Sequence, residues 1–272
     1  MINLIKTDTK RILKDKLFLV VCIIALCLSV FMPLLYKAMF SGMEVVEEDM
    51  FAEMFMISGK SLFFDSFSAG NNMGLIAPVF IAIIICKDFS QGTIRNKIIC
   101  GKTRIQIFLS LFASCFIVLF GVILAHALVT LGISCLLFGY QATPFTFADF
   151  GYLLLSILFE LLVYLCMSAV ITLICTFFRN IGGCIVLVVA INLVFALIDG
   201  ILMIGAAVTT NQATASVLEF FSKINIYGTS FPIAKGVAYG LRDILYILGA
   251  TIFGTATCLT LGVLSFRKKN LK

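Results

Sequence analysis

The sequence contains no tryptophan, a single histidine, four prolines and few charged residues. Only 12% of its 272 residues are Asp, Glu, Lys or Arg, whereas about a quarter are charged in a soluble domain. With 61% hydrophobic residues, the chain has too few charges to cover a soluble surface. The lone histidine, His126, leaves a histidine-based metal site or catalytic triad without its partners. We therefore expect an all-α integral membrane protein with no catalytic residues, and not an enzyme.

The charged residues leave long apolar stretches between them, and a helix needs roughly 20 residues to cross about 30 Å of hydrocarbon. These stretches predict six membrane spans in one transmembrane domain that covers residues 1–272. The expected spans are residues 17–36, 66–86, 105–127, 150–178, 181–198 and 244–266. The charge-free stretch of residues 105–148 is long enough for two spans. Because no charged turn divides it and its polar residues cluster late, we expect one span followed by an outer segment.

The basic residues predict the orientation, since cytoplasmic loops are rich in Lys and Arg and outer loops are not. Six spans with both termini in the cytoplasm place fifteen of the twenty basic residues inside and ten of the fourteen acidic residues outside. The long outer loops are then residues 37–65 and 199–243. The net charge of +6 follows from this orientation, so we expect membrane lipid around the chain and no nucleic-acid partner.

The ten cysteines are absent from both long outer loops, and no CxxC pair occurs. A disulfide framework or a zinc knuckle is marked by such placements in a sequence. We therefore expect the cysteines to be small apolar packing residues, with no disulfide framework and no metal site.

Two segments outside the spans have helical spacing. In residues 1–16, Ile5, Ile12 and Leu13 fall on one side and basic residues cover most of the rest, which predicts an amphipathic surface helix. A basic tail without structure is the alternative. Residues 214–228 alternate apolar and polar positions at helical spacing, so we expect a short helix lying on or dipping into the outer leaflet.

Three polar residues fall inside or near the ends of the spans. Glu160 lies within the fourth span, where an ionised group costs about 2.5–3.5 kcal/mol, so it should face protein or a wet cavity. Either a cargo or proton-relay role or a packing role between helices fits it. We expect His126, near the outer end of the third span, to be a packed polar residue, and Asn192 to hydrogen-bond a neighbouring helix.

The cytoplasmic loop contains Gly101-Lys102-Thr103, the last three residues of a phosphate-binding P-loop. That motif, G-x-x-x-x-G-K-[ST], requires a glycine five residues before Gly101, where this chain has Asn96. It also belongs to a strand followed by a helix in a soluble unit, for which this chain has no room. We expect no nucleotide on this chain.

The same loop predicts a short amphipathic helix between the second and third spans. Ser90 can cap its start, and Gly101 can end it. Its apolar residues Ile94, Ile98 and Ile99 fall on one face, and its polar residues Arg95, Asn96 and Lys97 fall largely on the opposite face. Such a helix can press against a cytoplasmic partner, whereas the alternative is a basic loop that only fixes orientation.

The loop resembles the one between the second and third spans of ABC-2 type transporter permeases. The matching pattern is Asp88-x-x-x-Gly92-Thr93, then Arg95 and Lys97, then Gly101-x-x-Arg104-x-Gln106-Ile107-Phe108-Leu109-Ser110. The basic surface helix, the acidic first outer loop and the six spans extend the resemblance to the whole chain. Two departures are the Gly101-Lys102-Thr103-Arg104 turn, where many members have Pro-x-Ser/Thr-Arg, and Leu111, where a Lys is common.

The resemblance implies the membrane subunit of a bacterial exporter in the plasma membrane. Such a subunit forms a homodimer or heterodimer with a second permease and moves a hydrophobic or amphipathic cargo, such as a drug, a lipid or an antimicrobial peptide. ATP binds to separate ATP-binding cassette ATPase subunits, so this chain carries no cofactor. The implied coupling residues are Asp88, Gly92, Thr93, Ile94, Arg95, Lys97, Ile98 and Arg104.

Two other functions are compatible with the sequence. An ion- or proton-coupled secondary transporter usually has inverted repeats and helices broken within the membrane, and we expect neither here. A receptor-like membrane module without transport activity is the other alternative.

Overall fold

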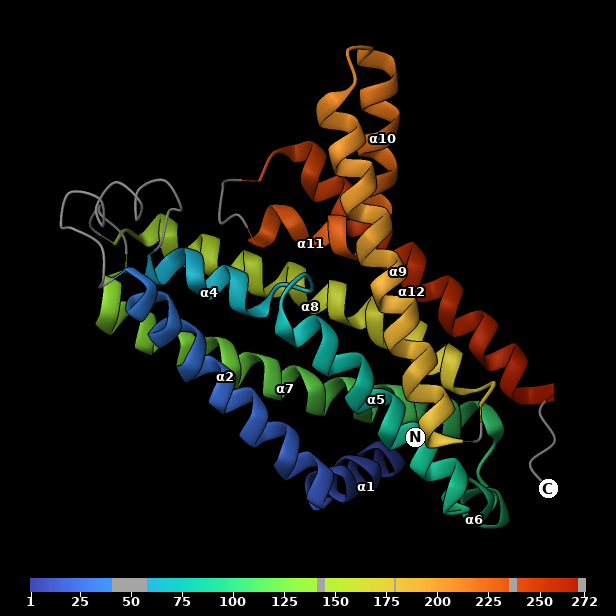
Figure 1. Ribbon diagram of the computed structural model, residues 1–272. Helices are drawn as coiled ribbons and strands as arrows, with labels where there is room; N and C mark the ends of the chain where they lie inside the picture. Colours follow the sequence, from blue (N-terminus) through green and yellow to red (C-terminus); the bar gives the residue numbers. More distant parts are fainter. Residues whose placement is uncertain (41–57, 141–144, 179, 235–238, 269–272) are drawn as a thin grey trace.

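The computed structural model describes residues 1–40, 58–140, 145–178, 180–234 and 239–268, and this part of the chain is helical with no β-strand (Figure 1). The helices are α1 (Ile2–Leu13), α2 (Lys16–Phe40), α4 (Gly59–Phe67), α5 (Asn72–Ser90), α6 (Thr93–Ile99), α7 (Arg104–Phe138), α8 (Phe147–Cys175), α9 (Ile181–Val208), α10 (Gln212–Ile224), α11 (Ile226–Ala234) and α12 (Leu241–Lys268). Six segments are long and apolar enough to cross a membrane: α2, α4 with α5, α7, α8, α9 and α12. In the part of the chain that the structure describes, the number of segments that could cross a membrane is therefore the expected one.

Three spans are longer than expected. The second runs from Gly59 to Ser90, so residues 59–65 of the expected first outer loop are helical, whereas residues 41–57 of that loop lie outside the described part of the chain. Helix α7 runs as one helix to Phe138, well beyond Ala127, because no proline or charge interrupts it before Gly139, whose φ of +75° ends the helix. Its 35 residues extend over about 52 Å, more than the hydrocarbon thickness. Residues 128–138 are therefore helical, and do not form a separate outer segment. Helix α9 likewise continues past Ile198 to Val208.

The second span is broken, which contradicts the expectation that no span is interrupted. Helix α4 ends at Phe67 and α5 starts at Asn72, so residues 68–71 form a non-helical break. Backbone groups at membrane depth must find partners within the protein. The N–H of Asn71 donates to the carbonyl of Ser68 at 3.1 Å, and the N–H of Gly70 donates to the Ser68 hydroxyl at 3.2 Å. The break is thus an ordered feature of the span.

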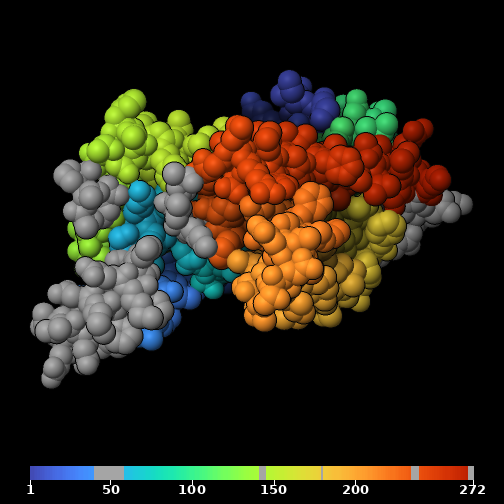
Figure 2. Space-filling view, turned by 90° about the horizontal axis from the view of Figure 1, so that it is seen from above, coloured from blue at the N-terminus to red at the C-terminus, as the bar shows by residue number. Residues whose placement is uncertain are grey.

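The outer segment also contains more structure than one surface helix. Helix α10 confirms the expected short helix, and it packs along the end of α9 to form a hairpin that extends beyond the other helices in Figure 1. The hydroxyl of Ser222 donates to Asp199 at 2.6 Å and fastens this hairpin. Seen from above, the hairpin lies beside α12 (Figure 2). Helix α11 then turns back into the protein.

The centre of the protein is built from α5, α7 and α8, which carry most of the buried side chains. Helices α2, α9 and α12 leave most of theirs exposed, as a lipid-facing or subunit-facing helix would. Helix α1, helix α6 and the final turn of α12 lie at one end, which we call the basic end (Figure 1). The positive-inside rule predicts that this end is cytoplasmic.

Candidate coupling site and intramembrane polar cluster

Helix α6 has both ends fixed by glycines with positive φ. Gly92, just before its first residue, has a φ of +69°, a conformation that costs other L residues roughly 1–2 kcal/mol. At the other end, Gly101 has a φ of +78° and donates to the carbonyl of Ile98 at 2.9 Å. The N–H of Lys102 donates to the carbonyl of Lys97 at 3.1 Å, which completes a Schellman motif. The helix therefore starts and stops where the glycines place it.

The Gly101-Lys102-Thr103 string connects two helices. Thr103 begins α7 with a capping box: its side chain accepts from the N–H of Gln106, and the Gln106 side chain accepts from the N–H of Thr103. A P-loop follows a strand, whereas this string follows a helix. Ser90 belongs to α5, where its hydroxyl donates to the carbonyl of Lys87, so it does not cap α6.

Four charged side chains form a buried ionic cluster behind α6. They are Asp8 and Arg11 of α1, Asp88 of α5 and Lys97 of α6. Arg11 donates from Nη2 to Oδ2 of Asp88 at 2.5 Å, and the ammonium of Lys97 lies 2.7 Å from Oδ1 of Asp8. The hydroxyl of Ser110 in α7 donates to Asp8 at 3.0 Å. The cluster therefore joins α6 to the N-terminal helix, the second span and the third.

Because the ionic cluster is buried, its stability depends on each charge having an oppositely charged partner. The side chains of Asp8 and Asp88 are 2% and 4% exposed, and that of Lys97 is 11% exposed. Two acids and two bases leave no net charge, and removing one partner from such a pair costs about 3–5 kcal/mol. Burial alone would lower the pKa of Arg11, but its hydrogen bond to Asp88 and the Asp88 charge raise that pKa.

A second ion pair joins the start of α2 to the end of α5. Lys87 lies 2.5 Å from Oδ2 of Asp15, and the N–H of Leu17 donates to the other oxygen of Asp15 at 3.1 Å. The hydrogen bond from Lys87 lowers the pKa of Asp15, which also caps α2.

The back of α6 is apolar and packs inward. Ile94 is 2% exposed and belongs to a cluster with Ile107, Phe108 and Leu111 of α7 and Phe266 of α12. Burying a side chain of this size contributes roughly 1.5–3 kcal/mol. Since Phe266 also contacts Phe89 of α5, the cluster ties α6 to three spans.

The outward side of α6 carries a different set of residues. Gln91, Arg95, Asn96, Cys100 and Lys102 are exposed, and Ile99 has 74% of its surface exposed. The predicted faces of α6 are therefore wrong at two positions, because Ile99 lies among the exposed polar residues and Lys97 turns inward to Asp8. An isoleucine so exposed among basic and polar residues suits contact with a partner.

The eight expected coupling residues differ in burial, and they form a buried, a partly buried and an exposed group. Asp88 and Ile94 are buried, and Gly92, Thr93, Lys97, Ile98 and Arg104 are partly buried. The guanidinium of Arg104 donates to the carbonyl of Arg267 at 2.6 Å, which holds α7 against the end of α12. Arg95 alone of the eight is exposed. Most of the set supports α6, and only Arg95 presents its side chain to the solvent.

Glu160 is held by the break in the second span. It lies halfway along α8 with 1% of its surface exposed, and its Oε1 accepts from the backbone N–H of Ala69 at 3.0 Å. The hydroxyl of Ser230 in α11 lies 3.0 and 3.1 Å from its two carboxylate oxygens. No ion pair in the part of the chain that the structure describes involves Glu160. Its partners are therefore dipoles from the break and from α11.

Hydroxyl groups from neighbouring helices and a close contact at Gly74 also fix the geometry of the break. The hydroxyls of Ser68 and Ser230 lie 3.1 Å apart, and the hydroxyl of Tyr164 donates to the carbonyl of Ser68 at 3.5 Å. A Cβ built on Gly74 would lie 1.7 Å from the carbonyl oxygen of Ala69. Only glycine therefore allows the first turn of α5 to approach the break this closely.

His126 and Asn192 each bond a neighbouring element. His126 is buried, and its Nδ1 lies 2.8 Å from the carbonyl oxygen of Ala25 in α2, so Nδ1 carries the proton and donates. Asn192 donates to the carbonyl of Val188 in its own helix and accepts from the hydroxyl of Tyr227 in α11 at 3.1 Å. The expectation that Asn192 bonds another helix is confirmed.

A cavity of about 460 Å³ opens beside the break, where α2, α5, α9 and α11 meet. Its polar wall contains the side chains of Asn71, Asn72, Asn192 and Tyr227. Its apolar wall contains Leu28, Leu75, Ile76, Leu193 and Ala196. A site that combines an apolar wall with a few fixed polar groups is typical of small-molecule binding.

The positions that the sequence did not reveal are partners of the predicted ones. Asp8 and Arg11 pair with the loop, and Ala69 and Ser230 pair with Glu160. One signal was available, because Asp8 is an acid in a basic segment and lies three residues before Arg11, on the same face of a helix.

Six long apolar helices around a buried core define a multi-pass helical membrane protein. No family model matches the sequence, and no curated protein matches it.

Proposed function

We propose that the chain is the membrane-spanning subunit of an ATP-driven exporter, as its resemblance to ABC-2 type permeases implies. This proposal rests on how α6 is attached to the protein. Buried ion pairs and apolar packing fix the inward side of this short helix. Its free side presents Arg95 and the 74% exposed Ile99. A separate ATPase subunit would dock on this side, and ATP would bind there and not on this chain.

The same arrangement supports a route from α6 to the cavity. Only Gln91 and Gly92 separate α5 from α6, and the ionic cluster links both helices to α1. At its other end, α5 begins at the break, next to the N–H that binds Glu160. A displacement of α6 would therefore move α5, which lines the cavity. Small shifts at a contact surface are transmitted through a protein by such movements of packed helices.

The cavity suits an amphipathic cargo. Its leucines offer contact to an apolar body. Its polar wall combines the Asn72 amide with Asn71, which is held by Asp65, and Asn192, which is held by Val188 and Tyr227, so the polar groups that face a cargo are fixed in position. A drug-like, lipid-like or peptide cargo has this composition. Export across a bacterial plasma membrane is the direction that the resemblance implies.

The docking proposal is tested by changing only the exposed side of α6. Arg95→Glu combined with Ile99→Asp should lower co-purification with the ATPase subunit at least about tenfold, the effect of about 1.4 kcal/mol. Lys10→Glu, an exposed charge reversal on α1, is the matched control and should leave assembly unchanged. Full assembly, ATP hydrolysis and cargo efflux in the double variant would contradict the proposal.

A second candidate function is an ion- or proton-coupled transporter. The specific observation in its favour is the broken span whose backbone N–H faces the buried Glu160, since secondary transporters bind their ions at such breaks. Reconstituted vesicles separate the two functions. Cargo movement that requires the ATPase subunit and ATP supports the exporter, whereas movement driven by an ion gradient with this chain alone supports the secondary transporter.

A further inference from the structure

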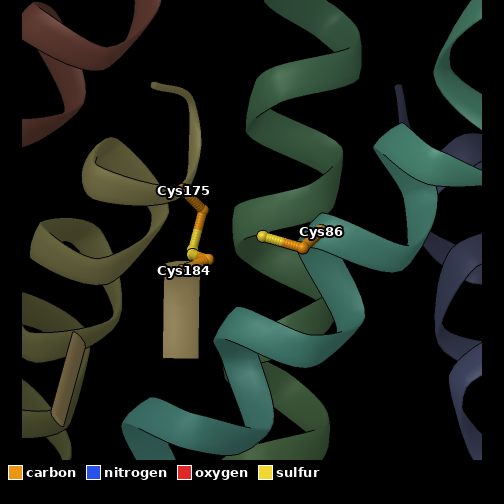
Figure 3. Close-up of side chains that lie close together, drawn as sticks. All are labelled: Cys86, Cys175 and Cys184. Atoms are coloured by element: carbon orange, nitrogen blue, oxygen red, sulfur yellow. The ribbon is translucent and has the colours of Figure 1, made fainter. Parts of the chain in front are cut away.

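Three buried cysteines from three spans meet in a single cluster (Figure 3). Cys86 comes from α5, Cys175 from the end of α8 and Cys184 from the start of α9, and each has 0% of its surface exposed. The three Sγ atoms all lie within 4.8 Å of one another, and those of Cys175 and Cys184 are 3.4 Å apart. The sequence predicted small apolar packing residues and no metal site, and it did not predict this cluster, because sequence spacing does not show which spans are neighbours.

The cluster lies close to the ends of its helices. Cys175 is the last residue of α8, Cys184 is in the first turn of α9, and Cys86 is in the last turns of α5. The cluster is therefore much nearer to the basic end than Glu160, which lies halfway along α8.

We propose that Cys86, Cys175 and Cys184 form a three-coordinate thiolate site for a soft metal ion, and that copper(I) is the ion it fits. With metal–sulfur bonds of about 2.3 Å, a planar three-sulfur site has sulfur atoms about 4.0 Å apart. The separation of 3.4 Å between Cys175 and Cys184 and the limit of 4.8 Å for all three pairs each lie within about 1 Å of this value, so side-chain shifts of less than about 1 Å complete the site. This inference does not depend on the proposed export function.

The donor set selects the ion. Thiolates favour copper(I) and zinc among common metals, but structural zinc takes four ligands. Among the residues that the structure describes, the group contains three sulfur donors and no histidine or carboxylate. Its surroundings belong to the apolar core. Binding one copper(I) ion releases the three thiol protons to solvent, and it involves no change of oxidation state.

The experiment uses the full chain in detergent, under reducing and oxygen-free conditions. Cys27 and Cys100, which are exposed, are first changed to alanine so that they cannot bind metal. Copper(I) is then titrated in competition with a coloured copper(I) chelator. We expect one copper per chain, three sulfur neighbours by X-ray absorption, and no displacement by an equal amount of zinc(II).

Single alanine variants test the ligands. Cys86→Ala, Cys175→Ala or Cys184→Ala should each weaken copper binding at least about tenfold, since even outer-shell partners of metal ligands contribute that much. Cys115→Ala, a buried cysteine outside the cluster, is the matched control and should bind as the parent does. Elution as a single species in gel filtration confirms that each variant is folded. Binding that survives loss of Cys86, or zinc that displaces copper, would overturn the proposal.

Discussion

At the residue scale, the ion pair between Asp8 and Lys97 is buried, and we expect the stability of the basic end to depend on it more than on any exposed contact there. Asp8→Asn or Lys97→Met should each lower the free energy of unfolding by about 3–5 kcal/mol, because each leaves a buried charge without its partner. The double variant should cost less than the sum of the two. Since the chain has no tryptophan, unfolding is best followed with a dye that reacts with buried cysteines as they become exposed. Arg95→Gln, on the exposed side of α6, is the control; additive effects would contradict direct pairing.

The pH dependence of the Asp15 pair has a definite sign. Lys87 lowers the pKa of Asp15 in the folded protein, so this pair stabilises the fold above the usual aspartate pKa near 3.8 and the stabilisation is lost as the pH falls through the lowered value. Asp15→Asn should therefore be destabilising at neutral pH, with an effect that shrinks below about pH 4. Unfolding measured at pH 7 and pH 3.5 tests this. A destabilisation that is equal at both values would show that the pair contributes nothing.

Glu160 allows a sharper distinction between a packing role and a transport role. Glu160→Gln keeps an acceptor for the N–H of Ala69, so we expect normal expression, a normal unfolding midpoint and retained cargo movement. Glu160→Leu removes the carboxylate from its bonds to Ala69 and Ser230 and should cost about 0.5–1.5 kcal/mol, because the N–H of Ala69 keeps only the Ser230 hydroxyl, 2.9 Å away, as its acceptor. Normal abundance of Glu160→Gln with no cargo movement would instead assign the carboxyl group to the transport cycle.

At the element scale, the broken span depends on Gly74. Gly74→Ala would place a methyl group against the carbonyl of Ala69, where backbone cannot give way without opening the break, so we expect a loss of about 3 kcal/mol or more. Gly121→Ala on α7 is the matched control, since nothing lies within 4 Å of its added methyl group and alanine favours a helix. Cysteine-dye unfolding compares the two. Equal stability of both variants would mean that the break has no fixed geometry.

At the scale of the whole molecule, the orientation is the property on which the docking proposal depends. In the background without Cys27 and Cys100, a cysteine at Thr210 should react with an impermeant maleimide on intact cells, whereas one at Gln91 should react only after lysis. Both positions are exposed. Thr210 lies in the turn between α9 and α10, which is at the opposite end of the protein from α6 (Figure 1). Reaction at Gln91 in intact cells would place α6 on the outer face and remove the proposed ATPase contact.

The sequence alone determined the features that depend on local composition. Apolar length predicted six spans, and glycine at Gly101 predicted the end of α6, because hydrophobic burial and positive φ act on a few consecutive residues. The absence of a helix breaker would also have shown that α7 continues to Phe138.

Only the tertiary structure decided which distant residues meet. Arg11 and Asp88 are 77 positions apart, and Ala69 and Glu160 are 91 apart. The cysteine cluster and the cavity beside the break likewise combine residues from separate spans. Hydropathy shows that a helix is buried in a membrane, but in lipid the pairing of helices is decided by packing and hydrogen bonds between side chains, which no single segment contains.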